Sequence, residues 1–201
     1  MGREGAGRGA VVVTPQALGD PARWNFDRRP GGPDDYGYVL ALVADLQERL
    51  CIDPDRVFVA GSSNGAAFAG LLVCQEPAVF AAVAMVIATT PSTCPAEVTP
   101  SRLSIRGTAD RTPDAVPMVS GDAERHRCAQ PPEVEPVADG VERRRFRDCA
   151  GGAELALVTI QGGDHSWPGS PQADRPGNSA AARSFPATDT ILDFFDHHPR
   201  R

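Results

Sequence analysis

The feature that most constrains the fold of this chain is a regular succession of short apolar runs and longer helix-like stretches. Short runs of apolar residues occur at 10–13, 57–60, 81–88, 103–105 and 153–160. The stretches between and after them include three helix candidates, at 34–50, 64–75 and 187–195. Strands that alternate with helices favour an α/β architecture with a mainly parallel sheet. We therefore predict one α/β domain over residues 1–201.

Residues 34–50 form the clearest helix candidate. Acidic residues suit the first turn of a helix, and Asp34 and Asp35 stand at this start. Apolar side chains then recur at three- and four-residue steps, at Val39, Leu42, Val43, Leu46 and Leu50. We expect this apolar face to pack on the sheet.

Four other segments carry weaker signals. The run at 10–13 stops near a proline and indicates a buried strand. Residues 81–88 indicate an apolar strand, although their alanine content leaves a helix as the alternative. Residues 111–140 have no sustained period and many charges, so we expect a surface excursion with one short helix near 122–127. The glycine- and proline-rich residues 162–178 are expected to form a loop.

Composition excludes two classes of partner. The formal net charge is −6 at pH 7, and an acidic surface does not bind nucleic acid or anionic lipid by counterion release. No uninterrupted apolar run reaches the roughly 18 residues that span a bilayer. Residues 1–9 lack the apolar stretch of a secretory signal. We expect neither nucleic acid nor a membrane as a partner, and no signal for export in this chain.

The five cysteines indicate thiols or disulfides rather than a metal site. They are Cys51, Cys74, Cys94, Cys128 and Cys149, without a Cys-x2-Cys pair or a His/Cys cluster among them. Cys128 and Cys149 flank a polar stretch, and a bridge between them would contribute about 3 kcal/mol in the chain-entropy model. Because the count is odd, at least one thiol has no partner within the chain.

The pentapeptide Gly61-Ser-Ser-Asn-Gly65 lies between a predicted strand and an alanine-rich helix. This setting is typical of a nucleophile elbow, in which a sharp, strained turn presents a serine at the edge of a sheet. Such a turn needs small neighbours, and Gly61 and Gly65 supply them. We predict that Ser63 is a nucleophile. The alternative is a serine that only caps the helix.

One of the four histidines suits the base that a serine nucleophile requires. His126 lies in a charged stretch, and His197 and His198 lie in a polar tail, where solvated or helix-end roles explain them. His165 follows the last predicted strand, in a Gly-Gly-Asp-His turn. A loop at the carboxyl end of the sheet can bring this imidazole over Ser63. We predict that His165 is the general base.

The carboxylate that orients the base is expected between the serine and the histidine. Hydrolases with this kind of elbow run in the chain order Ser, Asp or Glu, His. Asp110 ends the stretch Arg-Gly-Thr-Ala-Asp just after the strand candidate at 103–105, so it leaves the sheet at the same edge as Ser63 and His165. Asp114 is the second candidate. An aspartate that only stabilises a turn is the remaining explanation.

Five motifs in register resemble one known family. They are Ile52-Asp-Pro-Asp-Arg-Val57, Gly61-Ser-Ser-Asn-Gly65, Phe80-Ala-Ala-Val83, Gly107-Thr-Ala-Asp110 and Gly162-Gly-Asp-His-Ser-Trp-Pro-Gly169. Over residues 11–199 the chain resembles the polyhydroxybutyrate depolymerase and feruloyl esterase group of α/β-hydrolases. Five motifs together are much more specific than the pentapeptide alone.

The resemblance implies an α/β-hydrolase fold, with a mainly parallel sheet and flanking helices. It implies that Ser63, Asp110 and His165 are nucleophile, orienting acid and general base. It also implies that Trp24 and Trp167 lie near the active site and bind substrate, and a partly buried packing role is the alternative for each. An extracellular protein that acts on small or polymeric esters is the functional expectation.

Two departures and one absence distinguish this chain from the family pattern. Arg106 stands where the family usually has histidine, and Arg23 where it often has cysteine. Family members begin with further strands and a His-Gly loop before the segment that matches residues 10–15, and that loop normally supplies one oxyanion donor. The backbone N–H of Asn64 is expected to supply another. We therefore expect an N-terminally incomplete hydrolase with weakened activity.

These predictions describe a serine esterase that needs no cofactor and no metal. His165 takes the Ser63 proton as the hydroxyl attacks an ester carbonyl, and Asp110 fixes the imidazole tautomer. Water then hydrolyses the acyl-enzyme. Expected substrates are polyhydroxyalkanoate, feruloyl or acetyl esters. A serine peptidase of the same fold and a non-catalytic, hydrolase-like protein are the alternatives, and the oligomeric state is left open.

Overall fold

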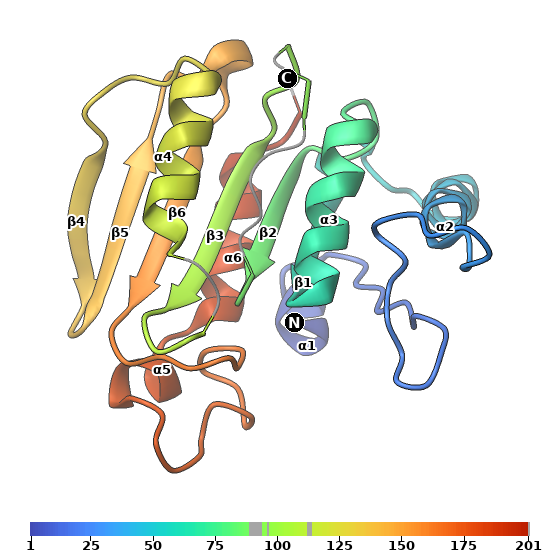
Figure 1. Ribbon diagram of the computed structural model, residues 1–201. Helices are drawn as coiled ribbons and strands as arrows, with labels where there is room; N and C mark the ends of the chain where they lie inside the picture. The colour runs from blue at the N-terminus through green and yellow to red at the C-terminus, as the bar shows by residue number, and fades with distance from the viewer. Residues whose placement is uncertain (89–93, 96, 112–113, 201) are drawn as a thin grey trace.

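A computed structural model places a six-stranded sheet at the centre of the molecule (Figure 1). It describes residues 1–88, 94–95, 97–111 and 114–200. The strands lie in the spatial order β1-β2-β3-β6-β5-β4. Their bounds are β1 Phe58–Ser62, β2 Ala82–Val86, β3 Ser101–Gly107, β4 Glu133–Ala138, β5 Val141–Phe146 and β6 Leu155–Ile160.

Strand direction divides the sheet into two parts. β1, β2, β3 and β6 are parallel, whereas β5 and β4 add an antiparallel hairpin at one end. The register places Ala60 opposite Ala84 and Ala84 opposite Leu103. Because parallel strands end at the same edge of a sheet, the turns after β1, β3 and β6 leave it together. The prediction of a mainly parallel sheet is confirmed.

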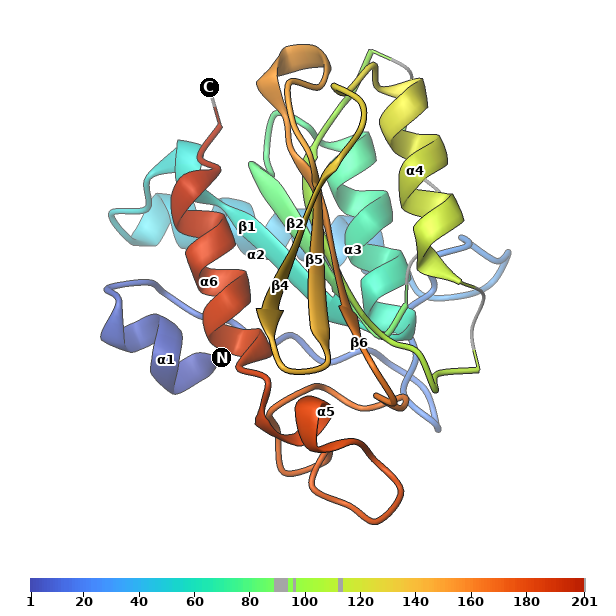
Figure 2. The ribbon, with the colours of Figure 1, turned by 90° about the vertical axis from the view of Figure 1, so that its left-hand side faces the viewer.

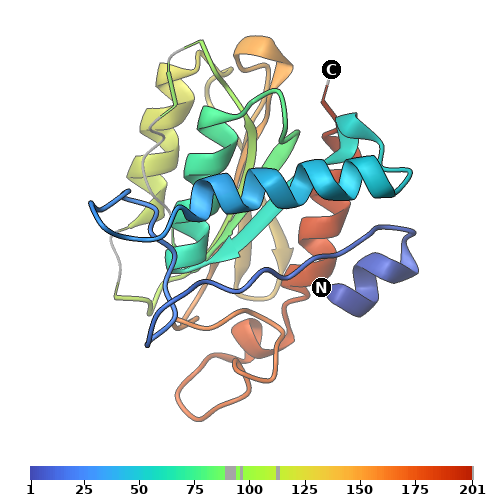
Figure 3. The same ribbon diagram turned by 90° about the vertical axis from the view of Figure 1, so that its right-hand side faces the viewer.

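Helices cover both faces of the sheet. α3 and α4 lie on one face and α6 lies on the other (Figure 2). α2 lies outside α3, and the short α1 packs on α6 (Figure 3). The helix bounds are α1 Gly2–Gly7, α2 Asp35–Arg49, α3 Asn64–Gln75, α4 Ala115–Arg125, α5 Ala180–Ser184 and α6 Ala187–His197, with single 3-10 turns at Pro54–Arg56 and Ala150–Gly152. The three predicted helices are therefore present.

The alternation of side chains along β2 shows how the core is built. Ala84 and Val86 belong to the apolar cluster beneath α6, while Val83 and Met85 belong to the cluster beneath α3. All five residues of this strand are buried. A strand that is covered on both faces needs apolar residues at every position, which explains the continuous run in the sequence.

The predicted strand at 10–13 is wrong. The segment is an irregular coil in which Val11 is 53% exposed and Val13 42% exposed. β-branched residues favour strands only where a neighbouring strand pairs with them, and this segment has no place in the described sheet. β1 is accordingly one of the two edge strands of the described sheet, and β4 is the other. The continuous apolar run at 57–60 predicts a strand buried on both faces. Instead, the first four residues of β1 are half-buried and Ser62 is exposed.

α2 contacts the core through part of its apolar face. Val39 is buried, and Val43 packs against the cluster that α3 shares with β1 and β2. Leu50, just beyond the helix, is 43% exposed. The expected packing of the whole face on the sheet is therefore limited to the residues nearest α3.

Residues 111–140 are more regular than predicted. They contain the whole of α4 and also β4, which pairs with the charged strand β5. Opposite charges face each other across this hairpin: Arg143 donates to Glu135 at 2.7 Å, and Arg145 donates to Glu133 at 3.1 Å. Because charged pairs stabilise these strands, their sequences lack the apolar alternation from which a strand is usually predicted. Residues 112 and 113 of this region lie outside the described part.

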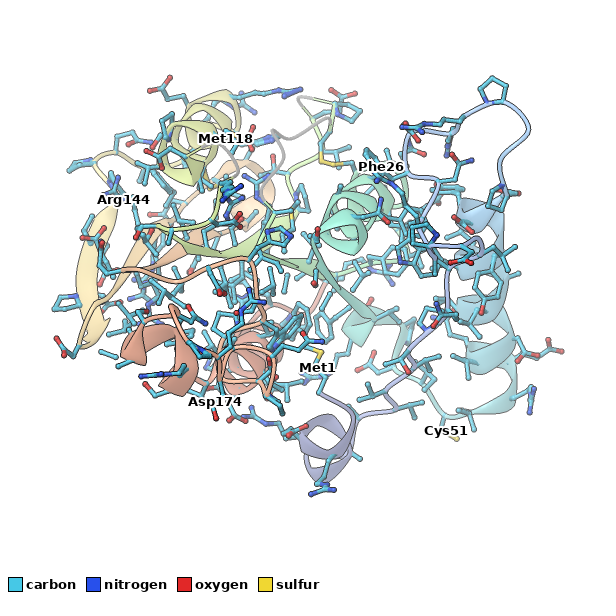
Figure 4. The ribbon with its side chains drawn as sticks, turned by 60° about the horizontal axis from the view of Figure 1, so that its bottom comes forward. Met1, Phe26, Cys51, Met118, Arg144 and Asp174 are labelled. Carbon is cyan, nitrogen blue, oxygen red and sulfur yellow. A yellow bond between two sulfur atoms is a disulfide. The ribbon has the colours of Figure 1, made fainter. Side chains whose placement is uncertain are left out.

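Four of the five cysteines form two disulfides. Cys74 pairs with Cys94, and Cys128 pairs with Cys149 as the sequence suggested. Cys51 is free and exposed, at the periphery of the molecule (Figure 4). Among the described helices, none has the length and apolar character needed to cross a bilayer.

Candidate active site

The turn between β1 and α3 holds Ser63 in a strained conformation. Its φ and ψ are 53° and −119°, and a positive φ is uncommon for a residue with a side chain. The turn is fixed on both sides. The Ser63 N–H donates to the Val86 carbonyl at 3.0 Å, and the Ser63 carbonyl accepts from the Ala66 N–H at 3.0 Å. This is the geometry of a nucleophile elbow.

The two glycines of the elbow differ in their roles. A Cβ at Gly61 would lie 2.1 Å from the carbonyl oxygen of Gly65, so only glycine fits at position 61. A Cβ at Gly65 would meet only the indole of Trp24, at 3.6 Å, which is ordinary van der Waals contact. The prediction that both glycines are needed for space therefore holds for Gly61 and not for Gly65.

The turns after β3 and β6 are locked to each other. A Cβ at Gly107 would lie 2.1 Å from the carbonyl oxygen of Gly163. The Ala109 N–H donates to that same carbonyl at 2.9 Å, and the Gly162 N–H donates to Thr108 Oγ1 at 2.8 Å. These contacts fix the turn that carries Asp110 against the turn that carries His165.

Ser63, His165 and Asp110 meet at the carboxyl edge of the sheet. His165 Nε2 lies 3.0 Å from Ser63 Oγ, and His165 Nδ1 lies 3.0 Å from each carboxylate oxygen of Asp110. The Asp110 side chain is 2% exposed, whereas the His165 side chain is 44% exposed. In this arrangement the imidazole can take the hydroxyl proton while the carboxylate orients the ring. The structure thus brings together the three residues that the sequence singled out.

Arg106 lies beside this group, although the sequence identified it only as a departure from the family pattern. Its Nη2 is 3.6 Å from Asp110 Oδ2, and the two side chains are 5% and 2% exposed. Burial lowers the pKa of Arg106, and the charges of Asp110 and Asp114 oppose this effect. A guanidinium nevertheless stays protonated in proteins. A charged residue at the end of an apolar strand, four positions before the acid, was the signal for it.

A network of hydrogen bonds braces the loop that carries His165. The buried Asn178 accepts from the Asp164 N–H at 3.1 Å and donates to the Ala173 carbonyl at 2.9 Å. Asp164 accepts from Arg175 Nε at 2.7 Å. Burial acts to raise the pKa of Asp164, but hydrogen bonds from Arg175 and Ser166 outweigh it and hold the pKa below its ordinary value. Residues 162–178 form the expected loop, and sequence reasoning missed this network within it.

Asn64 joins the elbow to the N-terminal segment. Its side chain accepts from the Trp24 N–H at 2.8 Å and donates to the Trp24 carbonyl at 3.2 Å. Its backbone N–H belongs to the first turn of α3, where N–H groups have no intrahelical carbonyl to bind. That N–H therefore lies next to Ser63, and its predicted role as an oxyanion donor stays a prediction.

The two tryptophans lie in different surroundings. Trp24 stacks on Phe68 with ring centroids 5.0 Å apart, and its indole contacts the first turn of α3. Trp167 packs against the cluster beneath α6 and donates from Nε1 to Thr188 Oγ1 at 3.2 Å. Trp24 is thus placed beside the elbow. Two residues after His165, Trp167 turns its N–H toward α6, as the packing alternative describes.

The alternative candidates have other roles. Asp114 is the N-cap of α4, where its side chain accepts from the Val116 N–H at 3.0 Å. His126 is buried and contacts Thr99 through Nδ1 at 3.0 Å. His198 contacts the carbonyl of Phe194, four residues earlier. In the described ranges, no group of acidic, cysteine and histidine side chains is arranged to hold a metal ion.

Comparisons with known proteins identify an esterase family. Residues 20–120 match the family model described as "Esterase PHB depolymerase". The match contains Ser63 and Asp110, whereas His165 lies beyond it.

Two curated proteins are similar to this chain. "Putative esterase NocK" of Nocardia uniformis subsp. tsuyamanensis is 30% identical over 203 residues, which cover 84% of this chain and 59% of that protein. "Feruloyl esterase B" of Piromyces equi is 25% identical over 189 residues, which cover 79% of this chain and 34% of that protein. The chain therefore spans only part of the length of either relative.

A solved structure shares the fold. Acetyl xylan esterase from Aspergillus awamori superposes with a TM-score of 0.57 at 16% identity, over 83% of this chain and 68% of that chain. The expected α/β-hydrolase fold, with a mainly parallel sheet and flanking helices, is thereby confirmed.

Proposed function

Because this chain belongs to the esterase PHB depolymerase family, we propose that it hydrolyses carboxylic esters through Ser63, His165 and Asp110. The observation that carries the proposal is the 3.0 Å contact of His165 Nε2 with Ser63 Oγ, together with the contacts of Nδ1 to Asp110. A neutral imidazole beside a serine hydroxyl is the general-base arrangement of serine hydrolases.

The reaction has two stages. In the first, His165 takes the hydroxyl proton, Ser63 Oγ bonds to the ester carbonyl carbon, and the alcohol leaves with the proton that His165 returns. In the second, His165 takes a proton from water, the hydroxide bonds to the acyl carbon, and the acid leaves as Ser63 regains its proton. Asp110 keeps Nδ1 protonated, so that Nε2 is the atom that accepts.

The oxyanion of each tetrahedral intermediate forms beside the N-terminus of α3. The Asn64 backbone N–H and the positive end of the helix dipole stabilise that charge. The two hydrogen bonds between the Asn64 side chain and the Trp24 backbone hold this turn in place before substrate arrives. Electrostatic stabilisation of this kind costs no reorganisation during the reaction.

We propose polyhydroxyalkanoate, feruloyl and acetyl esters as the substrate classes. The names of the similar proteins include feruloyl and acetyl xylan esterases. The exposed imidazole of His165 supports access by the ester groups of a polymer as well as by small esters. Trp24, stacked beside the elbow, supplies an apolar surface for the acyl group.

Covalent labelling tests the proposed nucleophile. We expect a fluorophosphonate probe to label the wild-type protein and to fail with Ser63→Ala. The matched control is Ser62→Ala, because Ser62 is the adjacent, exposed serine. Labelling that persists in Ser63→Ala, or a wild-type protein that is never labelled, would contradict the proposal and favour a non-catalytic protein.

Substrate profiling separates esterase from peptidase. We expect hydrolysis of p-nitrophenyl acetate, methyl ferulate or oligomers of 3-hydroxybutyrate. Dipeptidyl p-nitroanilides are expected to remain intact. Cleavage of the anilides at a comparable rate would favour a serine peptidase of the same fold.

We also propose that the protein acts in an oxidising, extracellular compartment. Its two disulfides support this, because such bonds persist outside the reducing cytosol. Protein isolated from its native source and alkylated without reductant is expected to carry the label at Cys51 alone. Alkylation at Cys74, Cys94, Cys128 and Cys149 would contradict the proposal.

A further inference from the structure

The strand β3 carries two buried arginines on one face. Leu103 and Ile105 belong to the cluster beneath α6, so Arg102 and Arg106 project to the opposite face, toward α4. Arg102 and Arg106 are 5% and 4% exposed. A buried guanidinium costs free energy unless an acidic partner and hydrogen bonds offset its desolvation.

The two arginines have different acidic partners. Arg102 pairs with Asp122 of α4 at 2.5 Å, away from the site. Arg106, at the carboxyl end of the strand, pairs with Asp110 at 3.6 Å. Oδ2 of Asp110 therefore faces the guanidinium of Arg106 and the imidazole Nδ1 of His165 at the same time.

We propose that Arg106 is a positioning residue of this site: its guanidinium holds the Asp110 carboxylate in place against His165, and its positive charge offsets part of the attraction between that carboxylate and a protonated imidazole. The inference rests on the proposed function, because it concerns the base of the same triad. It assigns to the chain a role for Arg106 in setting the pH range of the reaction.

A protonated His165 meets the charges of both Asp110 and Arg106. The Asp110 carboxylate stabilises an imidazolium, and a cation beside that carboxylate offsets part of this stabilisation. The offset is large because both partners of the pair are buried, where charges interact more strongly than in water. Removing the positive charge should therefore favour protonation of the His165 imidazole.

Three other charged groups lie around the site, and they are the same in the wild type and in variants at position 106. Asp114, at the start of α4, interacts with Arg106. Asp164 lies beside His165 in the chain and interacts with it, and Arg175 pairs with Asp164. None of these three groups is altered by a substitution at position 106.

A titration of the histidines by NMR tests the inference without requiring turnover. The His165 resonances are assigned with His165→Gln and followed against pH in wild type, Arg106→Gln and Arg106→Lys. We expect the His165 resonances to move to their protonated positions at a higher pH in Arg106→Gln than in the wild type. Arg106→Lys, which keeps the charge, is expected to titrate near the wild type.

Arg102→Gln is the matched control. It removes a buried arginine from the same face of the same strand and should lower thermal stability without moving the His165 titration. If Arg106→Gln fails to fold, Arg106→Met replaces it, because the flexible, unbranched side chain of methionine occupies part of the same space and carries no charge. A His165 titration unchanged in the neutral variant, or moved as far in Arg102→Gln, would overturn the inference.

Kinetics extend the test and separate the two proposals. In an active protein, the acid inflection of kcat/KM for p-nitrophenyl acetate should rise with the NMR value in Arg106→Gln and remain in Arg106→Lys. Suppose that the His165 titration differs between wild type and Arg106→Gln, but the wild type is neither labelled nor active. The proposed function would then be wrong, and the role of Arg106 would remain. An active wild type whose His165 titration is the same in Arg106→Gln would support the proposed function and contradict the role of Arg106.

Discussion

Gly107 and Gly163 touch backbone to backbone, so closely that a Cβ at position 107 would lie 2.1 Å from the Gly163 carbonyl oxygen. The contact joins the turn of Asp110 to the turn of His165. It makes the distance between the acid and the base depend on a position where no side chain fits.

Gly107→Ala should therefore lower the activity strongly while it lowers the stability of the fold only moderately. We expect a loss of about 1 to 3 kcal/mol in the free energy of unfolding and a fall in kcat/KM on the order of 10²-fold. Chemical denaturation and steady-state kinetics measure the two effects. The control is Gly121→Ala on the exposed face of α4, where a Cβ meets open space and should leave activity unchanged. Equal activity in both variants would show that the contact does not set the geometry.

Asn178→Ala should loosen the loop that carries His165. The substitution leaves the Asp164 N–H without its acceptor, whereas the Ser179 N–H keeps the Gly162 carbonyl at 3.3 Å. A donor left unpaired away from water costs about 1 to 3 kcal/mol. We expect a lower melting temperature and a reduced kcat. Ser184→Ala, which removes an exposed hydrogen bond from the neighbouring helix α5, is the control and should change neither. An unchanged kcat in Asn178→Ala would show that the loop keeps its shape without this network.

His126 should make the protein less stable in mild acid. Burial lowers its pKa below the ordinary value of 6.5, with Asp122 acting in the opposite direction. The unfolded chain therefore binds a proton at a pH where the folded protein does not. The resulting loss of stability begins as the pH falls below 6.5 and continues down to the folded-state pKa.

Melting temperatures between pH 5 and pH 8 test this expectation, with the pH range set about the ordinary pKa of histidine. The curve for His126→Gln should be flatter than that of the wild type. His197→Gln, at an exposed histidine, should follow the wild type. Parallel curves for wild type and His126→Gln would contradict the assignment.

The Cys128–Cys149 disulfide should contribute to stability without contributing to catalysis. It closes a segment of 21 residues that includes β4 and β5, and a loop of this size is expected to give about 3 kcal/mol. The double variant Cys128→Ser with Cys149→Ser should lower the free energy of unfolding by that amount and keep kcat/KM. Cys51→Ser, at the free thiol, should leave both unchanged. A loss of kcat/KM in the folded double variant would refute the separation of the two roles.

The elements that sequence reasoning found are those whose apolar pattern records a buried environment. β2 is apolar at every position because helices cover both of its faces. The glycines around Ser63 indicated the sharp turn from which α3 begins. The three members of the site could be placed because each follows a parallel strand. The triad contacts are short-range consequences of that topology.

Other elements have no apolar pattern that indicates how they are buried. β5 reads Val-Glu-Arg-Arg-Arg-Phe. The acidic cross-strand partners of its arginines are 8 and 12 positions away in the chain, so charge complementarity marks this strand rather than an apolar pattern. The coil at 10–13 shows the opposite error, because β-branched residues predicted a strand where no partner strand lies in the described sheet. The importance of Arg106 depends on its distance to Asp110, which only the fold determines.

The exposed fractions of Asp110 and His165, 2% and 44%, mean that the triad runs from a dry end to a wet one. At the dry end the protein alone sets the local dielectric. At the wet end an ester bound over Ser63 displaces the water and so completes the environment in which its own carbonyl reacts. A long acyl chain would shield the imidazole better than an acetyl group, and chain length would then enter kcat as well as KM.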